Sequence, residues 1–168
     1  DSKGVLCVNA AGNDHKDIDT EPNYPTSVYS FQDKKLDHFI TIGSSTKETE
    51  SKLPSSFSNY GQKSVDVFAP GSEIFNSVPQ SDYAVLQGTS MACPMVAGAA
   101  AFLKSYFPKK SMKEITEVIL KSSRSYKGTQ QTHPGTKQMV DFSMLSVTGG
   151  VVDLYSAVLM LMAEESGK

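Results

Sequence analysis

Cysteine is scarce in this sequence, with Cys7 and Cys93 the only two among 168 residues. Two cysteines cannot build a disulfide framework, and no Cys/His cluster has the spacing of a zinc site. Both cysteines stand in apolar runs, where a free cysteine behaves as a small hydrophobic residue, so we expect two buried, reduced thiols. Basic charge is not in excess either: 18 acidic and 16 basic residues give a formal charge of −2, which argues against a nucleic-acid-binding protein.

Long apolar segments and processing signals are also lacking. The longest apolar run, near residues 97–103, is far shorter than the roughly 18–20 residues that a membrane span requires. Residues 1–8 do not show the basic and then apolar pattern of a signal peptide. The length and a hydrophobic content of 39% instead suit one globular domain with a real core, spanning residues 1–168.

The order of the predicted elements indicates an α/β domain. Short, apolar, β-branched runs predict strands buried on both faces, the pattern of a parallel sheet, at residues 4–10, 38–43 and 65–69. A hairpin with a four-residue turn is expected at residues 74–78 and 83–86. Three helices are expected: one at residues 89–107, one that begins at the capping box Ser111-x-x-Glu114, and one at residues 154–164. Residues 127–147 look polar and irregular.

Ser90 is the first candidate for chemistry. It follows a hairpin and Gly88 and stands in the first turn of the expected helix. A helix N-terminus presents backbone N–H groups and positive potential, which suits a nucleophile beside a developing oxyanion. The alternative is that Thr89 and Ser90 simply cap the helix, since serine and threonine are favoured caps.

Asn13 is the second candidate, because it follows the carboxyl end of the first predicted strand. Ligands of open parallel sheets bind outside those strand ends. The asparagine amide can donate a hydrogen bond to developing negative charge. The alternative is an ordinary turn residue after Gly12.

Taken together, these two segments resemble the subtilisin-like serine peptidases, the subtilases. Residues 10–13 read Ala-Ala-Gly-Asn, and residues 88–98 read Gly-Thr-Ser-Met-Ala-Cys-Pro-Met-Val-Ala-Gly. Three further segments are similar to that family in the same order: Phe-Ser-Asn-Tyr-Gly at 57–61, Asp-Val-Phe-Ala-Pro-Gly at 66–71, and residues 149–158. The resemblance thus covers nearly the whole chain.

The resemblance implies a serine endopeptidase that hydrolyses peptide bonds. Ser90 would be the acylating nucleophile, and the Asn13 side chain with the Ser90 backbone N–H would form the oxyanion hole. Ala11 and Gly12 would line part of the substrate pocket, with Thr89 also counted as substrate-binding. Asp14 falls where the family often places a residue that touches substrate. Export from the cell is a family expectation only.

The sequence also departs from the family pattern. Met95 stands near the proline of the serine motif where the family usually has a histidine, and we interpret that change as packing. The subtilisin triad has the chain order Asp, His, Ser, yet only twelve residues precede Asn13. No Asp-Ser/Thr-Gly or His-Gly-Thr-His segment occurs. The triad His and Asp are therefore expected upstream of this sequence, and the segment alone is expected to be inactive.

Other titratable residues are weaker candidates. His15, His38 and His133 lack the small-residue context of the family's general base, and a substitute dyad of His38 with Asp37 is unsupported. The acidic run Asp14, Asp17, Asp19, Glu21 could ligate calcium, which subtilases often bind, although a solvated acidic loop is the favoured interpretation. Asp66 could neighbour a weak cation site by resemblance. No cofactor and no metal ligand are predicted.

The predicted fold is therefore α/β and subtilisin-like, a parallel sheet with helices on both faces, with the N-terminal half of the domain absent. The first strand would then be an exposed apolar edge. We expect self-association or pairing with the upstream half, through that edge or the helix face around residues 97–102. The alternative function is a non-catalytic binding module on a decayed subtilase fold. An α/β-hydrolase would need Gly-x-Ser-x-Gly, which Ser90 does not fit.

Overall fold

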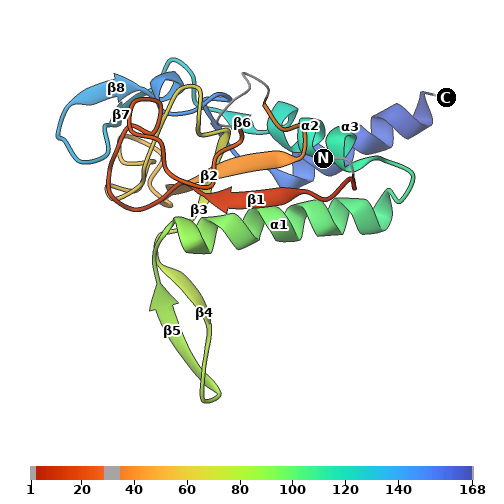
Figure 1. Ribbon diagram of the computed structural model, residues 1–168, viewed down its shortest axis with the longest axis horizontal. Coiled ribbons are helices and arrows are strands. Elements are labelled where there is room, and N and C mark those ends of the chain that lie inside the picture. The colour runs from red at the N-terminus through yellow and green to blue at the C-terminus, as the bar shows by residue number, and fades with distance from the viewer. Residues whose placement is uncertain (1–2, 29–34, 168) are drawn as a thin grey trace.

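The computed structural model describes residues 3–28 and 35–167, and a five-stranded sheet runs through it (Figure 1). The strand order is β1-β2-β3-β9-β6. β1, β2, β3 and β9 pair in parallel, and β6 pairs antiparallel with β9. The strands are β1 (Cys7–Ala10), β2 (Phe39–Ser45), β3 (Val67–Pro70), β6 (Arg124–Ser125) and β9 (Gly150–Val151).

The centre of the sheet is built by β2 and β3. Every residue of β2 is buried, as are the first three residues of β3. β-branched and aromatic side chains fit a pleated strand, and burial on both faces explains why these segments read as continuous apolar runs. The strands predicted at residues 38–43 and 65–69 are confirmed within one or two residues.

β1 lies at one edge of the sheet, so the prediction that it is buried on both faces is wrong. Cys7 is exposed, and the other three residues of the strand are half-buried. The predicted pair of buried thiols is wrong for the same reason, because Cys7 has a described strand, β2, on one side only. Cys93 is half-buried, its thiol donates to the carbonyl of Val8, and burial raises the pKa of this thiol.

Three α-helices pack against one face of the sheet. They are α1 (Thr89–Tyr106), α2 (Met112–Lys121) and α3 (Leu154–Ser166). Side chains of all three form one buried cluster with Ile40 and Ile42 of β2 and Val67 and Ala69 of β3. None of the helices in the described ranges is long and apolar enough to cross a membrane.

The opposite face carries loops and the single-turn 3-10 helix η1 (Phe142–Met144). Phe142 of this helix and Phe68 of β3 pack together in a second buried cluster, with ring centroids 5.1 Å apart. The α/β architecture with a parallel sheet is thus confirmed, and the helix on the second face is a single turn. The connections from β1 to β2 and from β2 to β3 are mainly irregular, which is why the α-helices gather on one side.

Residues 127–147, predicted to be irregular, contain a short hairpin. It consists of β7 (Gln130–Thr132) and β8 (Met139–Asp141). Three-residue strands are too short to show an alternating pattern. Gln131 is fully buried there because its side chain bonds the backbone of residues 49, 50 and 53.

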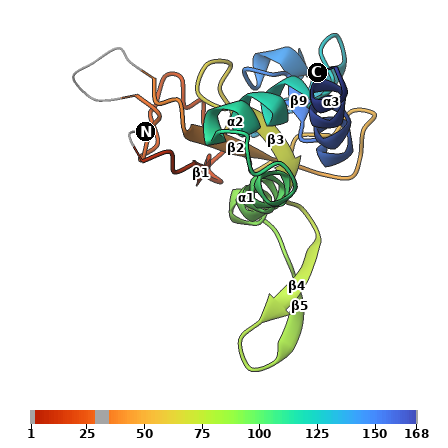
Figure 2. The same ribbon diagram turned by 90° about the vertical axis from the view of Figure 1, so that its right-hand side faces the viewer.

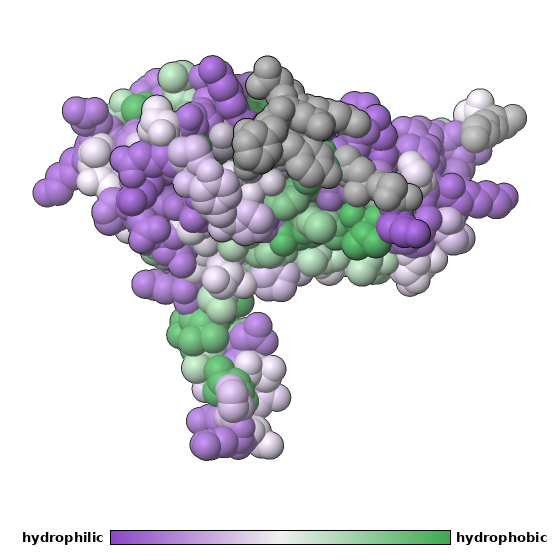
Figure 3. Space-filling model, in the orientation of Figure 1, coloured by the Kyte–Doolittle hydropathy of each residue, from purple (hydrophilic) through white to green (hydrophobic). Residues whose placement is uncertain are grey.

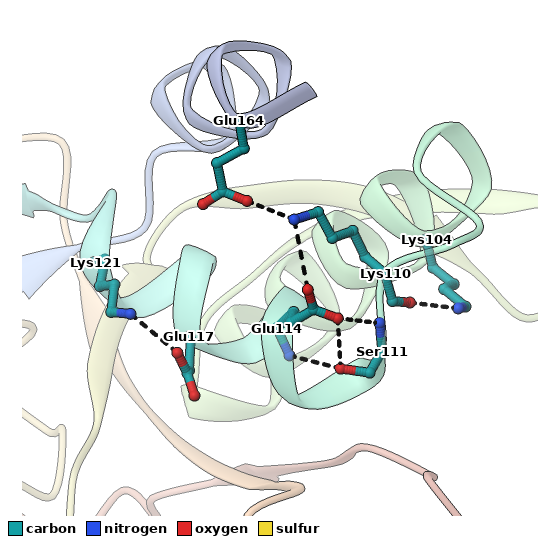
Figure 4. Close-up of polar contacts among 7 residues, drawn as sticks. All are labelled: Lys104, Lys110, Ser111, Glu114, Glu117, Lys121 and Glu164. Carbon is teal, nitrogen blue, oxygen red and sulfur yellow. Dashed lines mark hydrogen bonds and ion pairs between the residues drawn. The ribbon is translucent and has the colours of Figure 1, made fainter. Parts of the chain in front are cut away.

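α2 begins with the predicted capping box, shown in Figure 4. The Ser111 hydroxyl accepts from the Glu114 amide, and the Glu114 carboxylate accepts from the Ser111 amide. Lys110 then joins Glu114 to Glu164 at the end of α3. This network ties the start of α2 to the last turns of α3.

A hairpin of β4 (Ile74–Val78) and β5 (Asp82–Leu86) projects from the body of the molecule, as Figures 1 and 2 show. Phe75 and Tyr83 stack across it, with ring centroids 5.4 Å apart. The hairpin was predicted at this place with a four-residue turn, but Asp82 already pairs with Val78, so the turn is residues 79–81. The hairpin is followed by Gly88 and then by α1, whose second residue is Ser90.

Candidate active site

Ser90 is exposed in the first turn of α1, immediately after the N-cap Gly88. The carbonyl of Gly88 accepts from the amides of Met91 and Ala92, and its amide donates to the carbonyl of Gly71. Gly88 has φ 148° and ψ 161°, a conformation that only glycine adopts readily. The chain therefore turns sharply here and presents Ser90 at the positive end of an 18-residue helix.

Asn13 lies against this same helix start. Its Oδ1 atom accepts from the backbone amide of Thr89 at 2.8 Å and from the Thr89 hydroxyl at 2.9 Å. Because a backbone amide can only donate, the oxygen of the Asn13 amide faces Thr89 and the NH₂ group faces away. The two segments that the sequence singled out are thus brought together, although residues 13 and 89 are 76 positions apart.

The loop that carries Asn13 is bonded on its other side to Asn59, which is buried. The Asn59 side chain donates to the carbonyl of Ala11 and accepts from the amides of Asp14 and Lys16. Sequence reasoning quoted the segment of residues 57–61 but assigned no role to Asn59. The available sequence signal was an amide side chain in an otherwise aromatic and small-residue segment.

The residues predicted to contact substrate have specific places. Ala11 is fully buried in the second core cluster, and Gly12 is half-buried, with its amide donating to the Thr89 hydroxyl. Thr89 is buried and its hydroxyl is engaged by Gly12 and Asn13. Asp14 is exposed next to Asn13. Their contact with substrate stays a prediction.

The three histidines have specific places in the described structure, and His15 stands two residues after Asn13 in the same loop. His15 packs against Gly135, and the ring of His133 meets Tyr60 edge-on, with centroids 4.4 Å apart. His38 precedes β2, at the amino end of the sheet, whereas Asn13 follows the carboxyl end of β1. The parallel register of β1 with β2 separates these two ends by more than about 10 Å at roughly 3.3 Å per residue.

Several of the acidic residues considered for a cation are engaged within the chain. Asp17 accepts from the Asp19 amide, and Asp19 accepts from the Lys63 amide. Asp66 is buried and pairs with Lys35 at 2.6 Å. Over residues 3–28 and 35–167 no group of three or more His, Cys, Asp or Glu side chains that could hold a metal ion occurs, and calcium binding stays a prediction.

Comparison with known proteins decides the family. The model of the Subtilase family matches residues 1–143. The chain belongs to the subtilase family. It is 30% identical over 156 residues to Subtilisin-like protease 2 of Plasmodium falciparum, covering 89% of this chain and 10% of that protein. It is 47% identical over 104 residues to Thermitase of Thermoactinomyces vulgaris, covering 62% of this chain and 32% of that subtilase.

The fold of the chain is that of a subtilase as well. A solved cold-adapted subtilisin-like serine proteinase superimposes with a TM-score of 0.63 and 29% sequence identity. The match covers 90% of this chain and 47% of that one. The chain therefore spans about half the length of this solved subtilase, and a third or less of the two curated relatives.

Proposed function

We propose that this chain supplies the nucleophile and the oxyanion hole of a serine endopeptidase. The observation that carries the proposal is the pair of hydrogen bonds from Thr89 to Asn13 Oδ1. They turn the Asn13 NH₂ group away from Thr89, beside the helix start that carries the exposed Ser90. A preorganised donor next to a nucleophile is the arrangement that stabilises a tetrahedral oxyanion.

The proposed reaction begins when Ser90 Oγ attacks the carbonyl carbon of the scissile peptide bond. The Ser90 proton passes to a histidine, which then gives it to the leaving amine. Asn13 Nδ2 and the Ser90 backbone N–H hold the negative oxygen of the tetrahedral intermediate. The acyl group stays on Ser90 until water releases it. Ala11, Gly12 and Thr89 shape the adjoining substrate pocket through their backbone.

The histidine and aspartate of the triad come from the remaining half of a subtilase catalytic domain. The contacts of His15 and His133 are with Gly135 and Tyr60, His38 lies at the opposite end of the sheet, and the chain covers about half of the solved relative. The open edge of β1 is the surface on which that half would pair with this chain. The amides of Cys7 and Ala11 donate to the carbonyls of His38 and Ile42, on the side of β2. The amides of Val8 and Ala10 therefore point outward, because alternate amides of a strand face opposite sides.

The surface around this edge is apolar. Figure 3 shows a hydrophobic band on the face that carries β1 and α1. Exposed side chains include Val5, which precedes β1, and Met95, Phe102 and Tyr106 of α1. Such a patch suits a protein partner. We propose that the chain on its own is inactive and that it self-associates or pairs with the other half of the domain through this surface.

Kinetics on a peptide substrate test the proposed roles in the active protein, with the remaining half of the domain present. Ser90→Ala should abolish hydrolysis, while Ser105→Ala, an exposed serine in the last turn of α1, should not change it. Asn13→Ala should lower kcat by about 10²–10³-fold with little change in KM. Folded protein without any Ser90-dependent hydrolysis would instead favour a non-catalytic binding module.

A further inference from the structure

The loop that carries Asn13 is held by several hydrogen bonds from one residue, Asn59. Asn59 is 1% exposed, and all three hydrogen bonds of its side chain go to the backbone of residues 11–16. Each of these bonds measures 2.9 Å. The backbone amide of Asn59 adds a fourth bond, to the carbonyl of Gly12 at 2.9 Å. A buried asparagine whose amide is satisfied in this way keeps one orientation.

These bonds fall on both sides of Asn13. The carbonyl of Gly12 precedes Asn13 and accepts from the Asn59 amide, and the amide of Asp14 follows Asn13 and donates to Asn59 Oδ1. Both peptide units that flank Asn13 are therefore fixed by a single residue. The Asn13 side chain is fixed separately, by Thr89. The oxyanion donor is thus held between two points, one on its backbone and one on its amide.

The approach of Asn59 to this loop is close enough to require glycine. A Cβ atom at Gly12 would lie 2.4 Å from Asn59 Nδ2 and 3.0 Å from Asn23 Nδ2. Gly12 has φ 104°, which side chains rarely adopt. Asn23 joins Asn59 in donating to the carbonyl of Ala11. The loop therefore combines a strained backbone at Gly12 with a buried residue, Asn59, whose hydrogen bonds hold that backbone in place. Such an arrangement is typical of functional sites.

From this geometry we infer that Asn59 is a positioning residue for catalysis, which acts by holding the backbone of Asn13 so that its amide meets the oxyanion. The inference rests on the proposed oxyanion role of Asn13. Displacement of a catalytic group by about 1 Å, through a change that never touches substrate, can cost about 10²-fold in rate. Asn59 makes no bond to Ser90, so its effect must pass through the loop of Asn13.

The test is a double-mutant cycle between Asn59→Ala and Asn13→Ala in the active protein, with rates expressed per site titrated by a fluorophosphonate. With Asn13 present, Asn59→Ala should lower kcat by about 10-fold to 10²-fold and leave KM within about twofold. With Asn13 already replaced, the same change should alter kcat by less than about twofold, because the donor it positions is gone.

Gln131→Ala is the matched control. Gln131 is also a fully buried amide that bonds the backbone of a loop, at residues 49–53, but it has no bond to residues 11–16. It should lower thermal stability and leave kcat per titrated site unchanged. If Asn59→Ala does not fold, Asn59→Ser enters the same cycle with a short polar side chain.

Two outcomes would overturn the inference: an equal fall in kcat with and without Asn13, or no fall in either background. A different outcome tests the proposed function itself. If Asn13→Ala alone leaves kcat unchanged, the oxyanion role of Asn13 is wrong. If Asn13→Ala lowers kcat but Asn59→Ala adds to it independently, the oxyanion role stands and only the positioning role of Asn59 fails.

Discussion

Asn13 Oδ1 accepts hydrogen bonds from both the backbone amide and the hydroxyl of Thr89, at 2.8 and 2.9 Å. This contact joins the end of the edge strand β1 to the first residue of α1. The Thr89 hydroxyl also accepts from the amide of Gly12 at 3.2 Å. One threonine thus fixes the Asn13 amide, the proposed oxyanion donor, and the residue before it, while the next residue, Ser90, is left exposed.

Replacing Thr89 tests this contact. Thr89→Val keeps the shape of the side chain but removes the hydroxyl, so Asn13 loses one donor and Gly12 loses its acceptor. We expect kcat in the active protein to fall by about 3- to 10-fold, the net value of a typical hydrogen bond. Thr89→Ser, which keeps the hydroxyl, should stay near the original rate. Equal kcat for the Val and Ser variants would contradict the role of the hydroxyl.

The close packing beneath α1 predicts opposite effects at two glycines. A Cβ atom at Gly71 would lie 2.7 Å from the carbonyl oxygen of Gly88 and 2.4 Å from Ser44 Oγ. Gly71→Ala should therefore lower the free energy of unfolding by about 1–3 kcal/mol. Gly98, in the exposed middle of α1, has no atom within 4 Å of such a Cβ. Gly98→Ala should raise it by about 0.5–1 kcal/mol. Urea unfolding of the two variants checks both signs.

The capping box of α2 predicts a pH dependence of stability. Hydrogen bonds from the Ser111 amide and hydroxyl hold the pKa of the Glu114 carboxyl below its ordinary value of 4.5. Because the folded state favours the charged form, this contribution is present above the unfolded pKa and is lost as pH falls through the folded pKa. Glu114→Gln should flatten the loss of thermal stability below about pH 4.5.

The control for that experiment is Glu165→Gln, which removes a charge from an exposed residue near the end of α3. It should leave the acid limb of the stability curve close to that of the original protein. If the two variants lose stability in parallel as the pH falls, the capping box does not contribute the expected pH dependence.

The open edge of β1 predicts association of the isolated chain. Light scattering at tens of micromolar should show particles larger than one chain, because unpaired strand edges and apolar surface pair with one another. Val8→Pro removes an outward-facing amide and should reduce association, since proline is tolerated where a strand's N–H faces solvent. A clean monomer of the unchanged chain at that concentration would contradict this account of the edge.

Local signals predicted much of the fold. The hairpin β4–β5, the start of α1 after Gly88 and the capping box at Ser111 were all predicted because turn and cap residues act within a few positions. The apolar residues of β1 predicted burial on both faces, whereas its exposed edge was expected only from the family resemblance, because the exposure of a strand depends on which strands lie beside it. The short hairpin β7–β8 likewise depends on distant contacts of Gln131.

Part of the candidate site was likewise predicted from the sequence, and part was found only in the structure. Ser90 and Asn13 were found from their segments, and the structure brings those segments together at Thr89. The role of Asn59 was missed because its partners stand 43 to 48 positions away. No periodicity or cap pattern reports such bonds. The sequence marks the residues that carry chemistry, whereas the residues that hold them in place emerge only from the fold.

Labelling of Ser90 by a fluorophosphonate, read by intact mass, tests the central claim most directly. The chain is treated alone and again after addition of the remaining half of a subtilase catalytic domain, with Ser90→Ala as the control. We predict labelling only when both parts are present, because on our proposal the general base belongs to the remaining half of the domain. Labelling of the chain alone would show that a base within it activates Ser90 and would contradict the account. So would the absence of Ser90 labelling in a folded complex.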